Sequence, residues 1–261
     1  MSFLLQLPDN FIHFHFPVTD STMSRLRDPA LSSRKEDFVL VTADYQTAGH
    51  GQRGTSWEAE AGKNLLFGFL CHPTFVLPDT QFRLSEALAL AVAGAVGVMV
   101  EDVAVKWPND IYWRNRKICG MLLEHDLCAG RIASTFTGVG LNVNQRYFMS
   151  DAPNPASLYQ ILGHEVCREA LLADILQRFL RHYRSLQNGG AAALDAAYAA
   201  SLYRRTGYHP YSDAGGAFRA VFQAVLPDGR LLLRDERGKL RVYAFKELKF
   251  EPETPADVCH E

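Results

Sequence analysis

Short apolar runs separated by polar turns occupy most of the first 150 residues and predict β-strands. Three such runs, rich in β-branched and aromatic residues, cover residues 11–16, 38–45 and 64–71. Four more follow at close spacing and are separated by turn residues such as Asn115 and Gly130; they cover residues 103–106, 111–113, 117–127 and 131–144. Consecutive strands joined by tight turns predict an antiparallel meander.

Other segments repeat their apolar residues at helical spacing. A short helix is predicted over residues 22–27, where Ser21 can cap the first turn. The apolar segment 81–100 contains Glu86 and ends in an acidic pair, so we expect a buried helix rather than a membrane span. Helical spacing recurs over 167–186 and 191–203. The whole pattern predicts an α+β fold with a mixed or antiparallel sheet packed on helices.

The last 50 or so residues have a different pattern, with short strands and no further helix. Turns at Pro-Asp-Gly and Glu-Arg-Gly separate four predicted strands, which cover residues 218–226, 231–235, 239–245 and 248–250. A segment of this kind predicts a small β-barrel. We therefore expect two domains, a larger one over residues 1–207 and the barrel over residues 208–261.

Composition narrows the functional class. The chain has 261 residues, of which 48% are hydrophobic and 21% charged, and this suits one core plus a small second domain. A formal net charge of −2 offers no basic surface for DNA or an anionic membrane. The five cysteines show no Cys-x-x-Cys spacing, and the N-terminus lacks the order of a signal peptide. We expect a cytoplasmic protein with reduced thiols.

Residues 106–110, Lys-Trp-Pro-Asn-Asp, crowd polar side chains into strand-like sequence, and we call them the corner. Pro108 fixes a backbone angle in the middle of this group. Lys117 follows seven residues after Asp110. Two cations, an acid and an amide around one rigid turn favour a chemical site. Taken alone, Lys117 would be expected as a solvated strand residue, and Trp107 would suit core packing at least as well as ligand stacking.

Residues 49–54, Gly-His-Gly-Gln-Arg-Gly, match the G-x-G-x-x-G pattern of dinucleotide-binding proteins. The context does not fit, because a Rossmann turn opens a long helix, whereas this motif leads almost at once into the next predicted strand. The glycines could instead form a mobile loop whose backbone N–H groups wrap an anion, with Arg53 adding charge. An ordinary surface loop is an equally good interpretation. The P-loop pattern is missing from the sequence.

Together, these motifs resemble those of the biotin protein ligases, which attach biotin to carboxylase carrier proteins. The resemblance covers nearly the whole chain and rests on Asp-Ser-Thr at 20–22, residues 44–54 with Trp57, the corner with Lys117, Gly-Val-Gly-Leu-Asn at 138–142, and the C-terminal barrel. It implies a biotin/lipoate ligase-like catalytic domain followed by an SH3-like barrel.

The resemblance implies a reaction in two steps. The carboxylate of biotin attacks the α-phosphate of ATP to give biotinyl-5′-AMP and pyrophosphate. A lysine amine of a biotin carboxyl carrier protein then attacks the mixed anhydride. Since two anions meet in the first step, fixed cations are needed, and the resemblance gives Lys117 as the contact of both the biotin carboxyl and the α-phosphate. ATP and Mg²⁺ are the implied cofactors.

The resemblance also distributes the other site residues. Arg53 and Asp110 would join Lys117 in catalysis, and Asp110 would either hold Mg²⁺ or orient the incoming lysine. The implied biotin contacts are Ser21, Thr22, Gln46, His50, Gly51, Gln52 and Lys117. The implied ATP contacts are Gly49, Arg53, Trp57, Lys106, Asn109 and Asn142. The glycine loop would fold over both ligands and exclude water.

Three positions depart from the family's pattern. Met23 stands where asparagine is usual, His50 where arginine is usual, and Gln52 where a basic residue is common. A histidine is only partly charged near neutral pH, so the loop's hold on phosphate would depend on Arg53 and on backbone groups.

Some family members also carry a helix-turn-helix domain and bind DNA. Only about ten residues precede the first predicted strand here, so we expect an enzyme without DNA binding. A homodimer is possible, and the barrel could reach ATP or the acceptor through Lys246 or Glu247, or merely expose them. Two other functions stay open: a lipoate or octanoate ligase of the same superfamily, which the corner disfavours, and a non-catalytic biotin- or adenylate-binding module.

Overall fold

A seven-stranded sheet forms the centre of the larger part of the protein. The computed structural model describes residues 7–51, 56–149 and 154–253. The sheet has the order β1-β2-β3-β7-β6-β5-β4. Strand β1 runs parallel to β2 and the other neighbours are antiparallel, so the predicted mixed sheet and its β4–β7 meander are confirmed. The strands are β1 (Phe11–Thr19), β2 (Phe38–Gln46), β3 (Leu65–Cys71), β4 (Val103–Lys106), β5 (Asp110–Trp113), β6 (Arg116–Cys128) and β7 (Arg131–Leu141).

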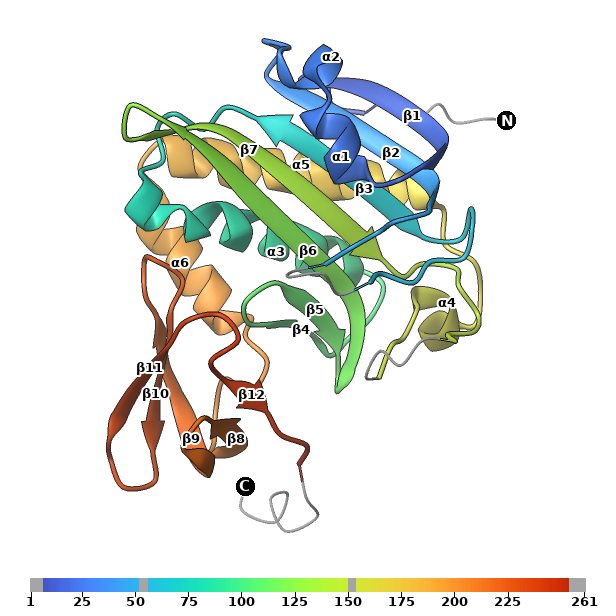
Figure 1. The fold of residues 1–261 in the computed structure, drawn as a ribbon. Coiled ribbons are helices and arrows are strands. Elements are labelled where there is room, and N and C mark those ends of the chain that lie inside the picture. The colour runs from blue at the N-terminus through green and yellow to red at the C-terminus, as the bar shows by residue number, and fades with distance from the viewer. Residues whose placement is uncertain (1–6, 52–55, 150–153, 254–261) are drawn as a thin grey trace.

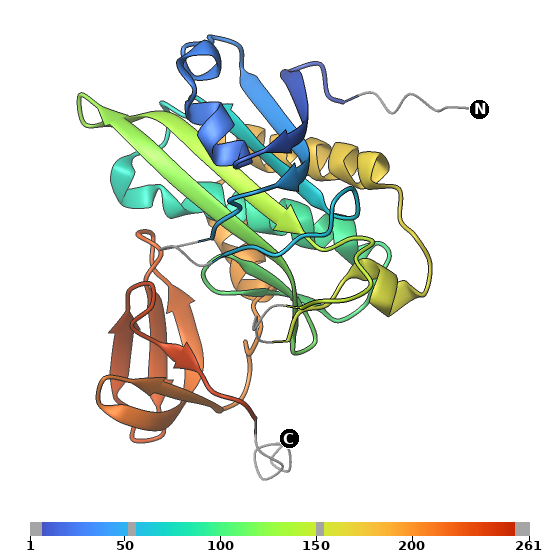
Figure 2. The same cartoon turned by 45° about the vertical axis from the view of Figure 1, so that its right-hand side comes forward.

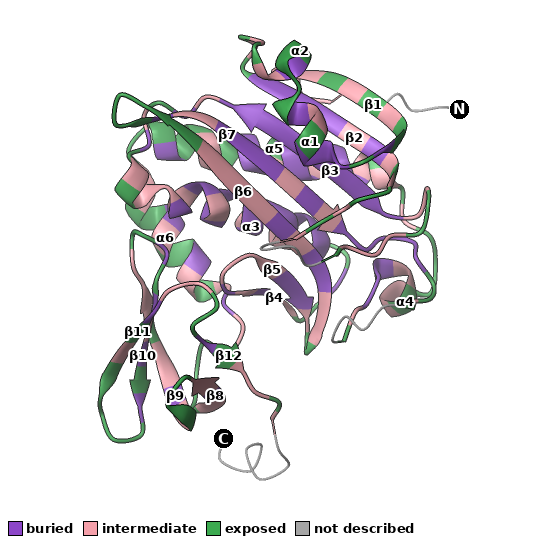
Figure 3. Cartoon of the chain, in the orientation of Figure 1, coloured by how far each residue is buried: buried purple, intermediate pink, exposed green. Residues whose placement is uncertain are grey.

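Helices cover both faces of this sheet (Figure 1). Successive strand residues point to opposite faces, so in β2 Phe38 and Leu40 join the core under helices α3 and α5, while Val39 and Val41 pack with α1. Strand β3 is buried along its whole length, as Figure 3 shows. These helices are α1 (Thr22–Arg27), α3 (Phe82–Gly97) and α5 (Arg168–Gln187). None of the described helices has both the length and the apolar composition needed to cross a bilayer.

Side-chain caps begin a predicted helix, α1, and an unpredicted one, α4. Ser21 caps α1 as expected, because its hydroxyl accepts a hydrogen bond from the Ser24 amide at 3.0 Å. Two short helices were not predicted, since four or five residues are too few to show a helical repeat. Helix α4 nevertheless has a complete capping box between Ser157 and Gln160. The remaining helices are α2 (Pro29–Ser32), α4 (Leu158–Leu162) and α6 (Ala191–Ala200), with a 3-10 turn, η2 (Pro78–Thr80).

The C-terminal strands form a second, antiparallel sheet, which Figure 2 shows as a separate unit. Its order is β11-β10-β9-β8-β12, and the described strands pair as an open sheet rather than a closed ring. Strand β8 was not predicted, because Pro210 argues against a strand from sequence alone. The predicted domain boundary after residue 207 stays a prediction; it lies between α6 and β8. The strands are β8 (His209–Asp213), β9 (Gly216–Val225), β10 (Leu231–Asp235), β11 (Leu240–Tyr243) and β12 (Lys249–Phe250).

Trp107 joins the two sheets. Its indole N–H donates to the carbonyl of Gly229 at 2.8 Å, and its ring centroid lies 5.5 Å from that of Phe245. Gly229, in the turn between β9 and β10, has φ +87°, and an added Cβ would lie 2.6 Å from Cδ2 of Phe82. Of the two interpretations that the sequence allowed for Trp107, the structure supports core packing, with the indole only 4% exposed.

Candidate active site

The predicted site residues meet in a cavity of about 770 Å³ on the face of β6 and β7, a volume typical of small-molecule sites. Among the predicted residues, Gly49 does not line the cavity, and Gln52 and Arg53 lie outside the described residues. The predicted residues that line it are Ser21, Thr22, Gln46, His50, Gly51, Trp57, Lys106, Asn109, Asp110, Lys117 and Asn142.

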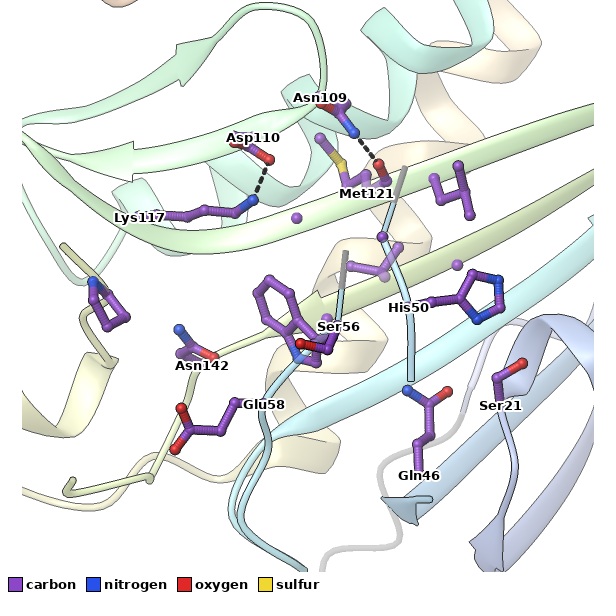
Figure 4. Close-up of a pocket in the computed structure, with 18 of the residues that line it drawn as sticks. Ser21, Gln46, His50, Ser56, Glu58, Asn109, Asp110, Lys117, Met121 and Asn142 are labelled. Atoms are coloured by element: carbon purple, nitrogen blue, oxygen red, sulfur yellow. Dashed lines mark hydrogen bonds and ion pairs between the residues drawn. The ribbon is translucent and has the colours of Figure 1, made fainter. Parts of the chain in front are cut away.

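One end of the cavity, which we call the charged end, is built on strands β5 and β6. Nζ of Lys117 lies 2.7 Å from Oδ1 of Asp110, and the two side chains point toward one another in Figure 4. These side chains are 29% and 21% exposed, so water screens the pair only partly. Hydrogen bonds also hold the Lys117 backbone, from its amide to Asn154 and from the Ala156 amide to its carbonyl. The ammonium therefore has a fixed position.

The corner is tied to β6 just before β5 begins. The side-chain amide of Asn109 donates to the carbonyl of Met121, as Figure 4 shows, and the amide of Met121 donates to the carbonyl of Asn109 at 2.9 Å. The peptide bond between Trp107 and Pro108 is cis. Asn109 and Asp110 thus line the cavity from a backbone that is held on both sides.

Lys106 lines the cavity but turns toward aromatic rings. Its ammonium donates to the Tyr112 hydroxyl at 3.0 Å and lies 5.1 Å from the ring centroid of Phe250, on strand β12. Burial lowers the pKa of Lys106; Asp110 opposes this effect, and the positive charge of Lys117 adds to it. Lys106 thus links the charged end to the C-terminal sheet.

The opposite end of the cavity, which we call the neutral end, offers hydrogen-bonding groups from α1 and the end of β2. Oε1 of Gln46 accepts from the Thr22 amide at 2.7 Å, and the Ser21 hydroxyl lies 2.8 Å from that of Ser24. The His50 ring pairs with the carbonyl of Ala48 at 3.2 Å. Figure 4 shows Ser21, Gln46 and His50 on the side away from Lys117. This end can recognise a neutral polar group.

Trp57 covers the glycine-rich floor between the two ends. The base of the glycine loop forms an antiparallel bridge between His50 and Ser56, and the described residues 56–64 lead to strand β3 without the long helix of a Rossmann turn. An added Cβ at Gly140 would lie 2.8 Å from Cζ2 of Trp57, which shows how closely the ring sits on β7. Nζ of Lys117 is 5.6 Å from the ring centroid.

Asn142, at the end of β7, presents an unused acceptor. Its side-chain amide donates to the carbonyl of Ala156 at 3.0 Å, whereas its Oδ1 is buried with no hydrogen-bond partner in the described parts of the chain. Buried polar atoms are normally paired, so an unpaired acceptor in a cavity wall marks a position for a ligand donor.

The sequence analysis named one possible Mg²⁺ ligand, Asp110, and this residue lines the cavity. Within the described ranges, no three His, Cys, Asp or Glu side chains gather as a metal site. This donor set suits Mg²⁺, which is commonly held by one or two carboxylates plus substrate phosphates rather than by a cage of protein ligands.

Several cavity residues escaped the sequence analysis because they lie on strands that read as core. Met121, Leu122 and Val139 belong to alternating apolar runs, and nothing in those runs indicates that a cavity opens there. Lys246 reaches the cavity from the segment between β11 and β12, which supports a site contact over simple exposure.

Comparison with known proteins agrees with this geometry. Residues 15–142 match the model of the biotin/lipoate A/B protein ligase family. The bifunctional ligase/repressor BirA of Bacillus subtilis is 27% identical over 87% of this chain and 70% of its own length. The biotin--[acetyl-CoA-carboxylase] ligase of Paracoccus denitrificans is 29% identical over 85% of this chain and 93% of its own length. That of Mycobacterium tuberculosis is 34% identical over 49% of this chain and 47% of its own.

Solved structures show the same fold. Biotin protein ligase from Aquifex aeolicus, in complex with biotin and ATP, superposes with a TM-score of 0.76 at 24% identity and covers 93% of this chain and 100% of its own. The Leishmania major enzyme with biotinyl-5-AMP gives 0.60 at 20% identity, over 91% and 99% of the two chains. The predicted fold class is confirmed. Residues 15–142 thus form a domain of the biotin/lipoate A/B protein ligase family, and the relatives similar to this chain include biotin--[acetyl-CoA-carboxylase] ligases.

Proposed function

We propose that this protein is an ATP-dependent biotin protein ligase, which forms biotinyl-5′-AMP and transfers the biotinyl group to a lysine of a biotin carboxyl carrier protein. The observation that carries the proposal is the shared cavity, with the Lys117–Asp110 pair at one end and neutral hydrogen-bonding groups at the other. Biotin has the matching form, a carboxylate on an apolar chain and a neutral ureido ring. The curated relatives named biotin--[acetyl-CoA-carboxylase] ligases point the same way.

The charged end performs the first step. A carboxylate oxygen of biotin attacks the α-phosphorus of ATP, and the bond to the bridging oxygen breaks to release pyrophosphate. Both reactants are anions, and Lys117 offers a fixed ammonium where their charges meet. The unpaired Oδ1 of Asn142 is an acceptor for a nucleotide donor. A magnesium ion, when bound, would neutralise phosphate charge, with Asp110 and the phosphates as its ligands.

The second step is aminolysis at the same place. The neutral amine of the acceptor lysine attacks the acyl carbon of the adenylate, and AMP leaves with the former carboxylate oxygen. Asp110 lies beside Lys117 and is placed to orient that amine. Trp57, over the floor of the cavity, helps to keep water from the anhydride together with the glycine loop.

The neutral end favours biotin over the alternatives. Gln46 and the start of α1 provide amide and hydroxyl groups for a ureido ring. Lipoate and octanoate have no such ring and would make no hydrogen bonds with these groups. A module that only binds biotin would not require a fixed ammonium beside a nucleotide-sized cavity.

The exchange of labelled pyrophosphate into ATP tests the proposal. We expect exchange that depends on biotin and that neither lipoate nor octanoate supports. Exchange that depends on lipoate would replace the proposal with the second function, and biotin binding without exchange would replace it with the third.

A further inference from the structure

The corner is held from behind by helix α6. The hydroxyl of Tyr198 donates to the carbonyl of Pro108 at 3.2 Å, on the side of the corner away from Asp110 and the cavity. Tyr198 is completely buried, and its ring packs edge-on against Phe82, with centroids 5.6 Å apart. Burial and the charge of Glu86 raise the pKa of the phenol well above its usual value, so the hydroxyl stays a donor.

A buried acid lies close to this tyrosine. Glu86 on α3 is 4% exposed, and its Oε2 has no hydrogen-bond partner in the described ranges. The charged and titratable groups that face it are Asp195 and Tyr198 on α6 and Arg83 on its own helix. Arg83 binds both carboxylate oxygens of Asp195, at 3.0 and 2.9 Å. The adenylation step has no use for this acid, which lies on the far side of the corner.

We propose that Tyr198 is a positioning residue for adenylation that holds the Pro108 carbonyl and thereby sets Asn109 and Asp110 in the cavity. The inference rests on the proposed function. Tyr198 touches no substrate and acts through the backbone of the corner.

Small displacements of the corner would affect the reacting groups. Without the phenol hydroxyl, the Pro108 carbonyl loses a partner in a largely dry place, and the corner can shift to find another. Asp110 pairs with Lys117 at 2.7 Å, so a shift of the corner also moves the reacting ammonium. Misplacing reacting groups by about 1 Å can cost on the order of a hundredfold in rate.

The test replaces Tyr198 with phenylalanine, which keeps the ring packing and removes only the hydroxyl. We expect Y198F to lower kcat for biotin-dependent exchange about tenfold with an unchanged KM for biotin, because the neutral end lies elsewhere. The matched control is Y203F, whose hydroxyl donates to Asn115 at 2.7 Å and which should exchange at the wild-type rate. A Y198F protein with wild-type kcat, or with lower thermal stability alone, overturns the inference.

If the wild type shows no biotin-dependent exchange, the proposed function fails; if it does and Y198F equals it, only this inference fails.

Discussion

The two ends of the cavity are built in different ways. The charged end lies on the neighbouring strands β5 and β6 of the meander, whose backbone pairing holds the Lys117–Asp110 pair. The neutral end combines the first turn of α1, the last residue of β2 and the base of a loop. The charged end is therefore a rigid site for chemistry, and the neutral end is assembled from separate elements for recognition.

This difference assigns separate kinetic effects to the two ends. Changes at the charged end should lower the rate of adenylation, because its charges act where negative charge gathers in the transition state. Changes at the neutral end should weaken the binding of biotin in the ground state and in the transition state alike, and so raise KM. The predictions below test this separation, beginning with the largest effect.

Replacing Lys117 with alanine should lower kcat for exchange by roughly a hundredfold to a thousandfold, because the fixed cation between two anions is lost. Biotin-dependent exchange measures this effect. K117R is the control that keeps the charge but not its geometry, and it should retain part of the activity. Near wild-type exchange by K117A would remove Lys117 from the reaction.

Replacing Gly140 with alanine should displace Trp57, since the added Cβ overlaps the indole. Overpacking of this kind typically costs about 2 kcal/mol of folding stability, and movement of the indole off β7 would relieve it. The assay compares biotinyl transfer to the carrier with release of biotinyl-5′-AMP into solution, and the released share should increase. G97A serves as the control, because nothing lies within 4 Å of its added Cβ. Equal behaviour of the two variants would contradict the role given to Trp57.

Replacing Gln46 with alanine should raise the KM for biotin about tenfold, because a hydrogen-bonding partner at the neutral end is lost and the Thr22 amide is left unpaired. The KM for ATP is the internal control and should not change. If kcat falls instead while KM for biotin stays constant, the two ends are not separate in function.

The last prediction concerns stability rather than rate. The pKa of Glu86 in the folded protein, about 8, lies above its ordinary value of 4.5, so the folded state binds the proton more tightly. The free energy of unfolding of the wild type relative to E86Q should therefore decrease as pH rises from about 4.5 to 8, by at most about 1.4 kcal/mol per pH unit. Urea unfolding at several pH values measures the difference, and a constant difference would show that Glu86 titrates normally.

The sequence analysis named the residues of the charged end but not the long-range hydrogen bonds that hold the corner in place. Alternation and turn residues were sufficient for the meander, in which β5 and β6 are neighbours, whereas the role of Lys117 was predicted through the resemblance. The hydrogen bond between Tyr198 and Pro108 joins residues 90 positions apart, and that between Trp107 and Gly229 spans 122. Such contacts depend on tertiary packing, which local patterns do not encode.

The neutral end was predicted only through the resemblance. Ser21 reads as a helix cap and Gln46 as the end of a strand, and both serve those structural roles as well as lining the cavity. A residue with a sufficient structural explanation gives no independent signal of binding. Strand β8 was missed for a different reason, because Pro210 lies in a strand that pairs on both sides.

The central claim is that this cavity joins biotin to the α-phosphate of ATP. The most direct measurement incubates the protein with biotin and ATP labelled at the α-phosphate, without carrier protein, and identifies the labelled product. We predict labelled biotinyl-5′-AMP together with an equal amount of pyrophosphate, and none from K117A. Labelled ADP, or no product that depends on biotin, would contradict the account.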